Sequence, residues 1–367
     1  MKQILTLLLM SICSVAFSQT TEIYVSDAGN FNNPPWQILK FDANGQNPSA
    51  FINTNLNWPQ DILFIEDSNF VLISNLGSNK ITRHNATTGA YISDFAGSIG
   101  GPTRMKIGPD SLLYVLQWTG NGRVRRYDLS GNYIGEFTSV SVGQSIGLDW
   151  DQNNNLYVSS YGGALVRKFN SNGADQGLFI NSNLQGPTNI WFDTNGDLLV
   201  ADYNGTSVKR FDSTGNFIND FMTGLNNCEG VAMFPNGNIL IGNGGNSSVK
   251  MFDSAGTYLS DFIPSGSGSL INPNAVVIRQ NNSTGVTEPK SKNAIIFTPN
   301  IGTEFFIHQK MIGELTSLEV FNIEGTFVEH IDFSQNNWNA EHLAPGNYML
   351  IATLKNKNTI TQQFVIR

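Results

Sequence analysis

Two sets of polar side chains recur at fixed points of a repeated sequence, and three aromatic side chains accompany one of them. The first set is Asp61, Arg104, Gln144, Asn189, Glu229 and Asn274, and the second is Asp27, Asn75, Gln117, Ser160, Asp202 and Asn243. Trp118, Tyr161 and Tyr203 each follow a member of the second set. Aromatic faces beside amides and carboxylates suit a sugar or a peptide, because rings stack while polar groups hydrogen-bond. We therefore expect a ligand at Trp118, Tyr161, Tyr203, Asp202, Gln117, Asn189 and Glu229.

The same polar residues allow two other interpretations. Glu229, Asn189 and Asp202 would suit a hard cation such as Ca²⁺, which prefers several oxygen ligands. A cation there would polarise a lactone or an ester. The alternative function is therefore that of a calcium-dependent lactonase-like or lyase-like enzyme. The third interpretation is structural, with polar groups that only cap strand ends and hold water. No other cofactor is expected, and binding is favoured over catalysis.

Histidine and cysteine are too scarce in the repeated region for most other site chemistry. His84 is the only histidine there, and it stands where other copies have Phe or Tyr, so we expect it to be packed. A zinc site or a Ser-His-Asp triad therefore lacks its side chains. Cys228 is the only cysteine after Cys13, and we expect it to be buried and structural.

The charge and composition of the chain bound its class. The formal net charge is −8, and the 21 lysines and arginines are scattered over 367 residues. A nucleic-acid partner is not expected, because a phosphate-binding surface needs clustered cations. The 36 glycines and the low share of charged residues, 14%, favour short strands joined by tight turns. The composition therefore predicts an all-β fold.

A hairpin sequence such as VKRFDSTG (208–215) occurs six times, with a period of about 42 residues. Its aromatic position is held by Phe41, His84, Tyr127, Phe169, Phe211 and Phe252. Six residues after each turn glycine stands a phenylalanine, namely Phe51, Phe95, Phe137, Phe179, Phe221 and Phe262. A period of about 40–45 residues with four strand-like runs per copy predicts a six-bladed β-propeller.

Two further features indicate a closed ring of blades. The residue three before each aromatic is Ile or Val, as in Val208 before Phe211, so each strand has apolar side chains on both faces. Both faces of a blade are buried when it lies between neighbouring blades. The first copy lacks an inner strand, whereas residues 275–279 form one after the last copy. We expect this strand to complete blade one and close the ring.

Residues 19–280 resemble the NHL-type six-bladed propellers. The segment PTNIWFDTNGDLLVADYNGTSVKRFDSTG (187–215) carries the resemblance, with Asp202, Asn204 and Gly215 at positions of the repeat pattern. The other copies are degenerate, and His84 and Met251 depart from it. The resemblance implies the propeller fold and leaves the chemistry open.

The N-terminal segment MKQILTLLLMSICSVAFSQ has the pattern of a secretory signal peptide over residues 1–18. Lys2 gives the positive start, Ile4 to Ile12 give a short apolar run, and Ala16 and Ser18 are the small residues before the cut. The apolar run is too short for a transmembrane segment. The sequence therefore predicts export across the inner membrane.

The C-terminal region, residues 293–367, follows a polar linker (281–292) and lacks the repeat. FTPN (297–300), LEVFNIEGTFV (318–328), LAPGNYML (343–350) and the final Arg367 resemble the type A C-terminal sorting domain of the type IX secretion system. Ile301 departs from the family, which usually has proline there. The resemblance implies a small immunoglobulin-like β-sandwich that engages the type IX machinery, and a product that is secreted or held at the outer-membrane surface. An immunoglobulin-like adhesive module is the alternative.

Overall fold

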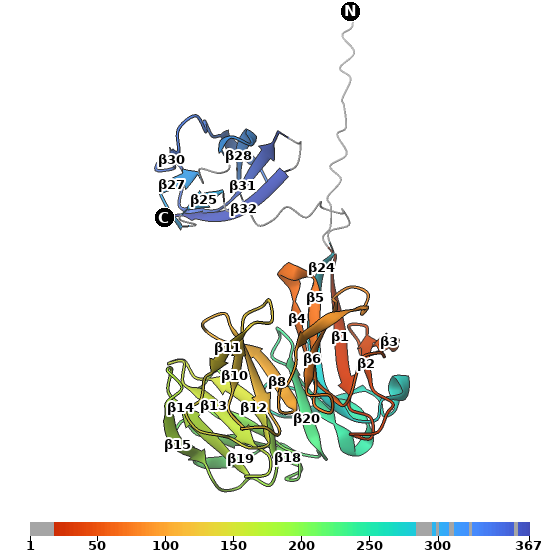
Figure 1. The fold of residues 1–367 in the computed structure, drawn as a ribbon. Coiled ribbons are helices and arrows are strands. Elements are labelled where there is room, and N and C mark those ends of the chain that lie inside the picture. Colours follow the sequence, from red (N-terminus) through yellow and green to blue (C-terminus); the bar gives the residue numbers. More distant parts are fainter. Residues whose placement is uncertain (1–17, 284–295, 299–300, 308–311, 323–324, 356–358) are drawn as a thin grey trace, which may run out of the picture. The chain divides into compact units, whose positions relative to one another are not determined.

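A computed structural model describes residues 18–283, 296–298, 301–307, 312–322, 325–355 and 359–367. The chain divides into two compact units, Gln19–Asn282 and a C-terminal unit, Ser283–Arg367. Figure 1 labels strands of both units. The proposed signal peptide (residues 1–17 of it) and most of the proposed linker lie outside the described residues. No helix in the described ranges has the length and apolar character needed to cross a membrane.

The described part of the N-terminal unit contains six four-stranded sheets, named here sheets one to six in chain order. Sheet one has the order β24–β1–β2–β3, with β24 Pro273–Ser283, β1 Ser18–Asp27, β2 Gln37–Phe41 and β3 Ser49–Ile52. Sheet two consists of β4 Pro59–Ile65, β5 Phe70–Asn75, β6 Lys80–Asn85 and β7 Tyr91–Ala96. Sheet three consists of β8 Pro102–Ile107, β9 Leu113–Gln117, β10 Arg125–Tyr127 and β11 Tyr133–Glu136.

The other three sheets follow the same order along the chain. Sheet four consists of β12 Ser145–Trp150, β13 Leu156–Ser160, β14 Leu165–Phe169 and β15 Asp175–Ile180. Sheet five consists of β16 Pro187–Phe192, β17 Leu198–Asp202, β18 Ser207–Phe211 and β19 Phe217–Met222. Sheet six consists of β20 Cys228–Met233, β21 Ile239–Asn243, β22 Ser248–Phe252 and β23 Tyr258–Ile263. Short 3-10 helices are η1 Glu66–Ser68, η2 Gly244–Asn246 and η3 Ser267–Ser269.

The first strands of successive sheets contact one another, β4 with β8, β8 with β12, β12 with β16 and β16 with β20. Hydroxyl groups join inner strands, since Thr103 of β8 donates to the Ser145 carbonyl of β12 at 2.7 Å and Thr188 of β16 donates to the Cys228 carbonyl of β20 at 3.1 Å. The inner strands therefore surround a common centre, and their side chains decide what occupies it.

Both faces of the sheets are buried, as the apolar residues three apart predict. In sheet five, Phe211 packs with residues of sheet four, such as Tyr157 and Val166. Val208, on the same strand β18, packs with Ile241 and Phe252 of sheet six. The two side chains point to opposite faces, because successive residues of a strand alternate. Each sheet is therefore held between its neighbours by apolar burial.

Each of the six turn glycines lies against the backbone of the repeated phenylalanine of a neighbouring sheet. Gly215 has a φ of +88°, and a Cβ atom there would overlap the carbonyl oxygen of Phe179 in β15 of the preceding sheet. The other turn glycines meet the corresponding phenylalanine carbonyl in the same way: Gly45 with Phe262, Gly89 with Phe51, Gly131 with Phe95, Gly173 with Phe137, and Gly256 with Phe221. Glycine is required twice over, for its positive φ and for this close approach.

We expect Gly215→Ala to lower the free energy of unfolding by about 3 kcal/mol, from left-handed strain together with the overlap at Phe179. Gly196→Ala is the matched control, because Gly196 has a similar φ of +85° but no atom within 4 Å of the added Cβ. It should cost about 1–2 kcal/mol, from strain alone. Urea titration of both variants measures the two losses of unfolding free energy. Equal losses would contradict a destabilising overlap with the Phe179 carbonyl.

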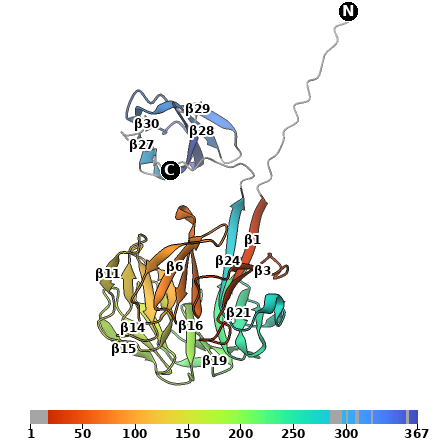
Figure 2. The ribbon, with the colours of Figure 1, turned by 45° about the vertical axis from the view of Figure 1, so that its right-hand side comes forward.

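Strand β24 completes sheet one, as the unpaired inner strand in the sequence predicts. It pairs with β1, so a segment after the last repeat lies beside the first strand of the unit (Figure 2). Arg279 of β24 forms an ion pair with Glu66 at 2.8 Å and lies over the Phe64 ring, 4.3 Å from its centroid. The two ends of the repeated region are thereby joined.

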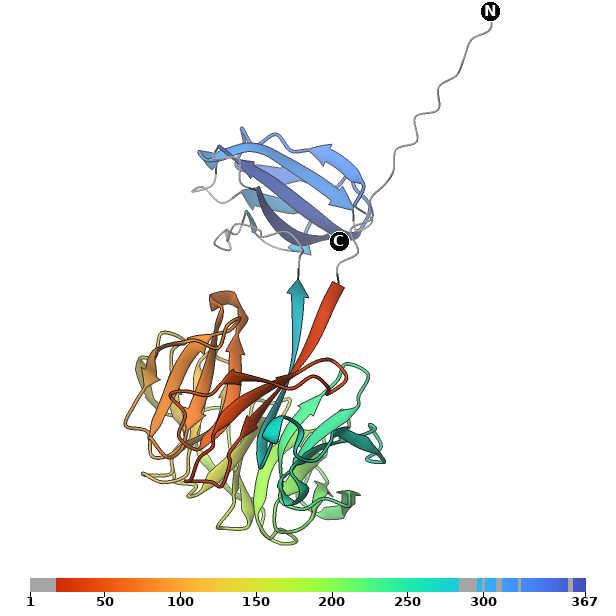
Figure 3. The ribbon, with the colours of Figure 1, turned by 90° about the vertical axis from the view of Figure 1, so that its right-hand side faces the viewer.

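The C-terminal unit contains two sheets in its described residues, seen in blue in Figure 3. One has the order β25–β27–β30, with β25 Phe297–Thr298, β27 Glu304–Ile307 and β30 Asn337–Asn339. The other has the order β26–β32–β31–β28–β29, with β26 Ile301–Gly302, β32 Thr359–Ile366, β31 Gly346–Leu354, β28 Leu315–Asn322 and β29 Phe327–His330. Phe305, Leu318, Leu350 and Phe364 belong to one buried core. The unit thus has a core of its own.

Candidate ligand cavity

A cavity of about 220 Å³ lies at the start of the inner strands. Its lining includes Trp118, Tyr161 and Tyr203, the three aromatic residues that the sequence analysis selected. Each directly follows the second strand of its sheet, as do Ala28 and Leu76, which also line the cavity. The ring centroids of Trp118 and Tyr161 are 5.6 Å apart, and those of Tyr161 and Tyr203 are 6.0 Å apart. Three neighbouring sheets therefore build one continuous aromatic wall.

Polar groups on the inner strands also line the cavity. They are Gln60 of β4, Glu229 of β20 and Asn274 of β24, together with Thr188 of β16 and Asn272. Gln60, Glu229 and Asn274 are all more than nine-tenths buried. The cavity therefore combines aromatic walls with a small number of hydrogen-bonding groups, the usual composition of a small-molecule site.

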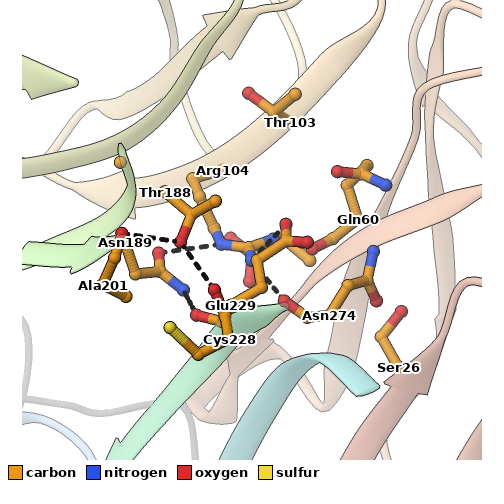
Figure 4. Close-up of polar contacts among 12 residues, drawn as sticks. Ser26, Gln60, Thr103, Arg104, Thr188, Asn189, Ala201, Cys228, Glu229 and Asn274 are labelled. Atoms are coloured by element: carbon orange, nitrogen blue, oxygen red, sulfur yellow. Dashed lines mark hydrogen bonds and ion pairs between the residues drawn. The ribbon is translucent and has the colours of Figure 1, made fainter. Parts of the chain in front are cut away.

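Arg104 of β8 occupies the centre of the ring of inner strands (Figure 4). Its Nε donates to Asn189 Oδ1 at 2.9 Å, and its NH2 group donates to Glu229 Oε1 at 2.9 Å. It also donates to the backbone carbonyls of Gln60 and Asn274. One buried guanidinium thus joins β8 to β4, β16, β20 and β24, and a planar group with five donors suits this task.

The charge state of Glu229 follows from its burial. Burial raises the pKa of this carboxyl group to about 7, and the guanidinium of Arg104 opposes the rise. Burial together with the nearby Glu229 charge also raises the pKa of Tyr203 to about 12. Near neutral pH Glu229 is therefore divided between its two protonation states, and Tyr203 is a neutral phenol.

A second cavity, of about 300 Å³, lies further along the same inner strands. Asp61, Arg104, Lys106, Asn189 and Trp191 are among its lining residues. In each strand that reaches both cavities, the residues of the first cavity precede those of the second, as Thr188 precedes Asn189. Arg104 and its partner Glu229 line one cavity each, so their network separates the two.

The structure divides the seven predicted ligand residues into groups. Trp118, Tyr161, Tyr203 and Glu229 line the first cavity, whereas Asn189 lines the second and donates to the Glu229 carbonyl at 2.6 Å. Gln117 and Asp202 are not among the residues that line either cavity, and both are fully buried and hold loops. Gln117 accepts from the Gly100 N–H at 3.2 Å, and Asp202 accepts from the Gly186 N–H at 2.7 Å.

Loop anchoring is a shared role of the polar residues that end the second strands. Asn75 accepts from Asn57 N–H at 2.9 Å, and Asn243 accepts from Asn226 N–H at 2.6 Å, as Asp202 does from Gly186. Asp27 accepts in the same way from the Asn272 N–H, at 2.9 Å. These side chains fix the loop that leads into the inner strand. The residue that follows the second strand lines the cavity in five of the six sheets, namely Ala28, Leu76, Trp118, Tyr161 and Tyr203.

The proposed cation ligands Glu229, Asn189 and Asp202 do not form one site. Glu229 and Asn189 both accept from the Arg104 guanidinium, whose positive charge opposes a second cation there. Asp202 is held by backbone amides and by Lys209 at 3.3 Å. Within the described residues, no group of three His, Cys, Asp or Glu side chains could hold a metal ion. The residues present therefore do not fit Ca²⁺.

His84 and Cys228 are packed, as expected. The imidazole of His84 is fully buried, with its ring nitrogens 3.0 Å from the Gly89 carbonyl and from Thr82 Oγ1, and burial lowers its pKa. Burial raises the pKa of the Cys228 thiol to about 12. Neither group is available as a base or nucleophile near neutral pH.

Sequence reasoning missed Phe31, Trp58 and Gln60 in the cavity. Phe31 lies in the loop after β1, whereas Trp58 directly precedes β4 as Gln144 precedes β12, and the two ring centroids are 5.7 Å apart. Gln60 directly precedes Asp61, so a shift of one residue in the assumed register would have found it. No signal of the repeat pattern points to Phe31, whereas Trp58 occupies the repeat position of Gln144.

Comparison with known proteins supports the fold alone. No protein-family model matches the chain, and no curated protein matches it. A chain in the crystal structure of a nidogen–laminin complex is 14% identical, with a TM-score of 0.58, over 71% of this chain and 98% of that one. A protein of unknown function from Bacteroides caccae is 15% identical, with a TM-score of 0.56, over the same shares. Together with the radial sheets, these likenesses show a β-propeller.

Proposed function

We propose that this protein is an exported six-bladed, NHL-type propeller that binds an extracellular glycan or peptide in the first cavity. The observation that carries the proposal is the aromatic wall of Trp118, Tyr161 and Tyr203 beside the buried polar groups of Gln60, Glu229 and Asn274. Rings of this kind stack on a sugar or a side chain, and the polar groups fix its orientation.

Binding is favoured over hydrolysis by the carboxylates of the cavity. Glycoside hydrolysis ordinarily uses two carboxyl groups that face the same bond. In the described part of the chain, Glu229 is the only carboxylate that lines the first cavity, and Asp61 lines the second. A general acid at Glu229 would therefore lack its partner.

We expect the triple variant Trp118→Ala, Tyr161→Ala and Tyr203→Ala to weaken ligand binding about 100-fold or more, because three stacking faces are lost. Binding to a glycan array, cell-wall preparations and a peptide array measures the effect. The control is the triple variant Tyr91→Ala, Tyr133→Ala and Tyr258→Ala, which removes three aromatic side chains that are 41–53% exposed on outer strands. Retained binding in the first variant would contradict the proposal that the ligand binds at this aromatic wall.

We further propose that residues 293–367 form a type IX sorting domain of immunoglobulin-like sandwich architecture, and that residues 1–18 are a signal peptide. The separate core of the C-terminal unit supports an independently folded tag. In a strain with type IX machinery, deletion of residues 293–367 should leave the propeller in the periplasm. Fractionation and surface protease accessibility measure this, with the full-length chain as control. Surface delivery of the deleted form would contradict the proposal.

A further inference from the structure

The first cavity has a second aromatic wall, built from Phe31 and Trp58. Phe31 lies in the loop after β1 of sheet one and Trp58 in the loop before β4 of sheet two, whereas Tyr161 and Tyr203 follow strands of sheets four and five. Around a ring of six sheets, the first and second lie across the centre from the fourth and fifth. A ligand in the cavity therefore meets aromatic faces on two sides.

The backbone at Phe31 and Trp58 is held in an unfavourable conformation. Their φ angles are +60° and +51°, a region that costs a residue with a side chain about 1–2 kcal/mol. The indole N–H of Trp36 donates to the Phe31 carbonyl at 2.7 Å, and the Leu76 N–H donates to the Trp58 carbonyl at 3.1 Å. A left-handed φ also occurs at Gln144 (+50°) and Asn227 (+53°), the residues directly before β12 and β20, so at Trp58 it belongs to the loop geometry of the repeat.

Asn274, which lines the cavity, carries a buried hydrogen-bond acceptor without a partner in the described residues. Asn274 is 1% exposed and donates from Nδ2 to the Pro59 carbonyl at 2.7 Å, but no partner for its Oδ1 atom is found in the described residues. A buried acceptor without a partner costs about 1–3 kcal/mol until a donor arrives. The Gln60 side chain, also in the lining, has no hydrogen bond within the described residues either.

The cavity is closed at its inner end. Arg104, Glu229 and Asn189 fill the centre of the ring between the two cavities, and the side chain of Arg104 is 6% exposed. A polymer therefore cannot thread through the ring and must present an end. At about 220 Å³ the cavity is smaller than the roughly 300–1,000 Å³ typical of drug-sized ligands, so it suits one ring.

We propose that this cavity binds the terminal residue of a glycan end-on, with its ring between the two aromatic walls and a hydroxyl or amide donor on Asn274 Oδ1. This inference rests on the proposed function and selects a glycan over a peptide. A quaternary ammonium group would also stack on aromatic rings, but it has no donor for Asn274. The charge of Glu229 is already opposed by Arg104, which favours a neutral sugar.

The test uses the full mature chain on an array of glycans that combine different terminal residues with different internal sequences. We expect the bound glycans to share a terminal residue, whatever their internal sequence, and the methyl glycoside of that residue alone to compete. Asn274→Leu should weaken binding about 10-fold, because the acceptor is lost. If Asn274→Leu fails to fold, Gln60→Leu tests the polar lining in its place. Phe31→Ala and Trp58→Ala test the second aromatic wall.

The possible results separate this inference from the proposed function. Glycans that share an internal segment and bind more tightly with each added unit would overturn end-on binding and leave a glycan-binding propeller. Binding to peptides alone would overturn the proposal that the ligand is the end of a glycan. Competition by choline but by no methyl glycoside would overturn it as well. If the protein binds no glycan and no peptide in any of these assays, the proposed function is overturned as well.

Discussion

Replacement of Arg104 by methionine should lower the free energy of unfolding by about 3–5 kcal/mol at pH 8. The change leaves the buried carboxylate of Glu229 without its cation, which is the costly way to break a buried ion pair. It also removes the donor from the carbonyls of Gln60 and Asn274. Five of the six inner strands lose their common contact.

The loss should depend on pH. The pKa of Glu229 is about 7 with Arg104 present, against an ordinary value of 4.5, and it rises further when the guanidinium is removed. Between these values the folded state binds more protons than the unfolded state, so stability falls as pH rises. The Arg104→Met variant should therefore lose less at pH 5, where Glu229 is neutral, than at pH 8.

Denaturant titrations at both pH values measure this effect, with two controls. Adding Glu229→Gln to Arg104→Met should recover part of the loss at pH 8 and reduce its pH dependence, because the unpaired Glu229 carboxylate is gone, whereas the buried Asp61 carboxyl group still lacks the Arg104 charge. Arg126→Met breaks an ion pair with Asp110 at 3.3 Å on a half-exposed surface and should cost about 1 kcal/mol or less. Equal, pH-independent losses for Arg104→Met and Arg126→Met would refute the central role of Arg104.

A propeller that ends at Asn272 should fail to fold, whereas one that ends at Ser283 should unfold cooperatively. The shorter form lacks β24, so β1 has an unpaired inner edge, and the buried Ala275 and Val276 are lost. The ion pair of Arg279 with Glu66 is lost with them. An open ring exposes apolar surface that the closed ring buries.

Circular dichroism, thermal unfolding and size-exclusion chromatography compare the two truncated forms, which differ by β24 alone. A synthetic peptide of residues 273–283, added during refolding, should restore part of the ordered state of the shorter form because it supplies the missing strand. Identical melting temperatures for the two forms would mean that β24 does not close the ring.

Much of the candidate site was predictable because repeats place equivalent residues at equivalent points. Trp118, Tyr161 and Tyr203 each follow the second strand of a copy, so the period alone brings them to one face. The roles of Asp202 and Gln117 were not predictable from this spacing. A polar side chain at a strand end can face the cavity or its own loop, and the backbone path of that loop decides which.

The amino-acid sequence by itself determined the repeated strands, the two buried faces of each sheet and the missing inner strand that β24 supplies, because these depend on local periodicity. Only the tertiary structure decided which copies touch. The turn glycine Gly215 meets Phe179 of the preceding sheet, not Phe221 of its own copy, and similar copies carry no signal that tells them apart. Likewise, the six inner strands surround one centre, and the side chain of one arginine fills it. That Arg104 occupies it is a consequence of packing around the closed ring.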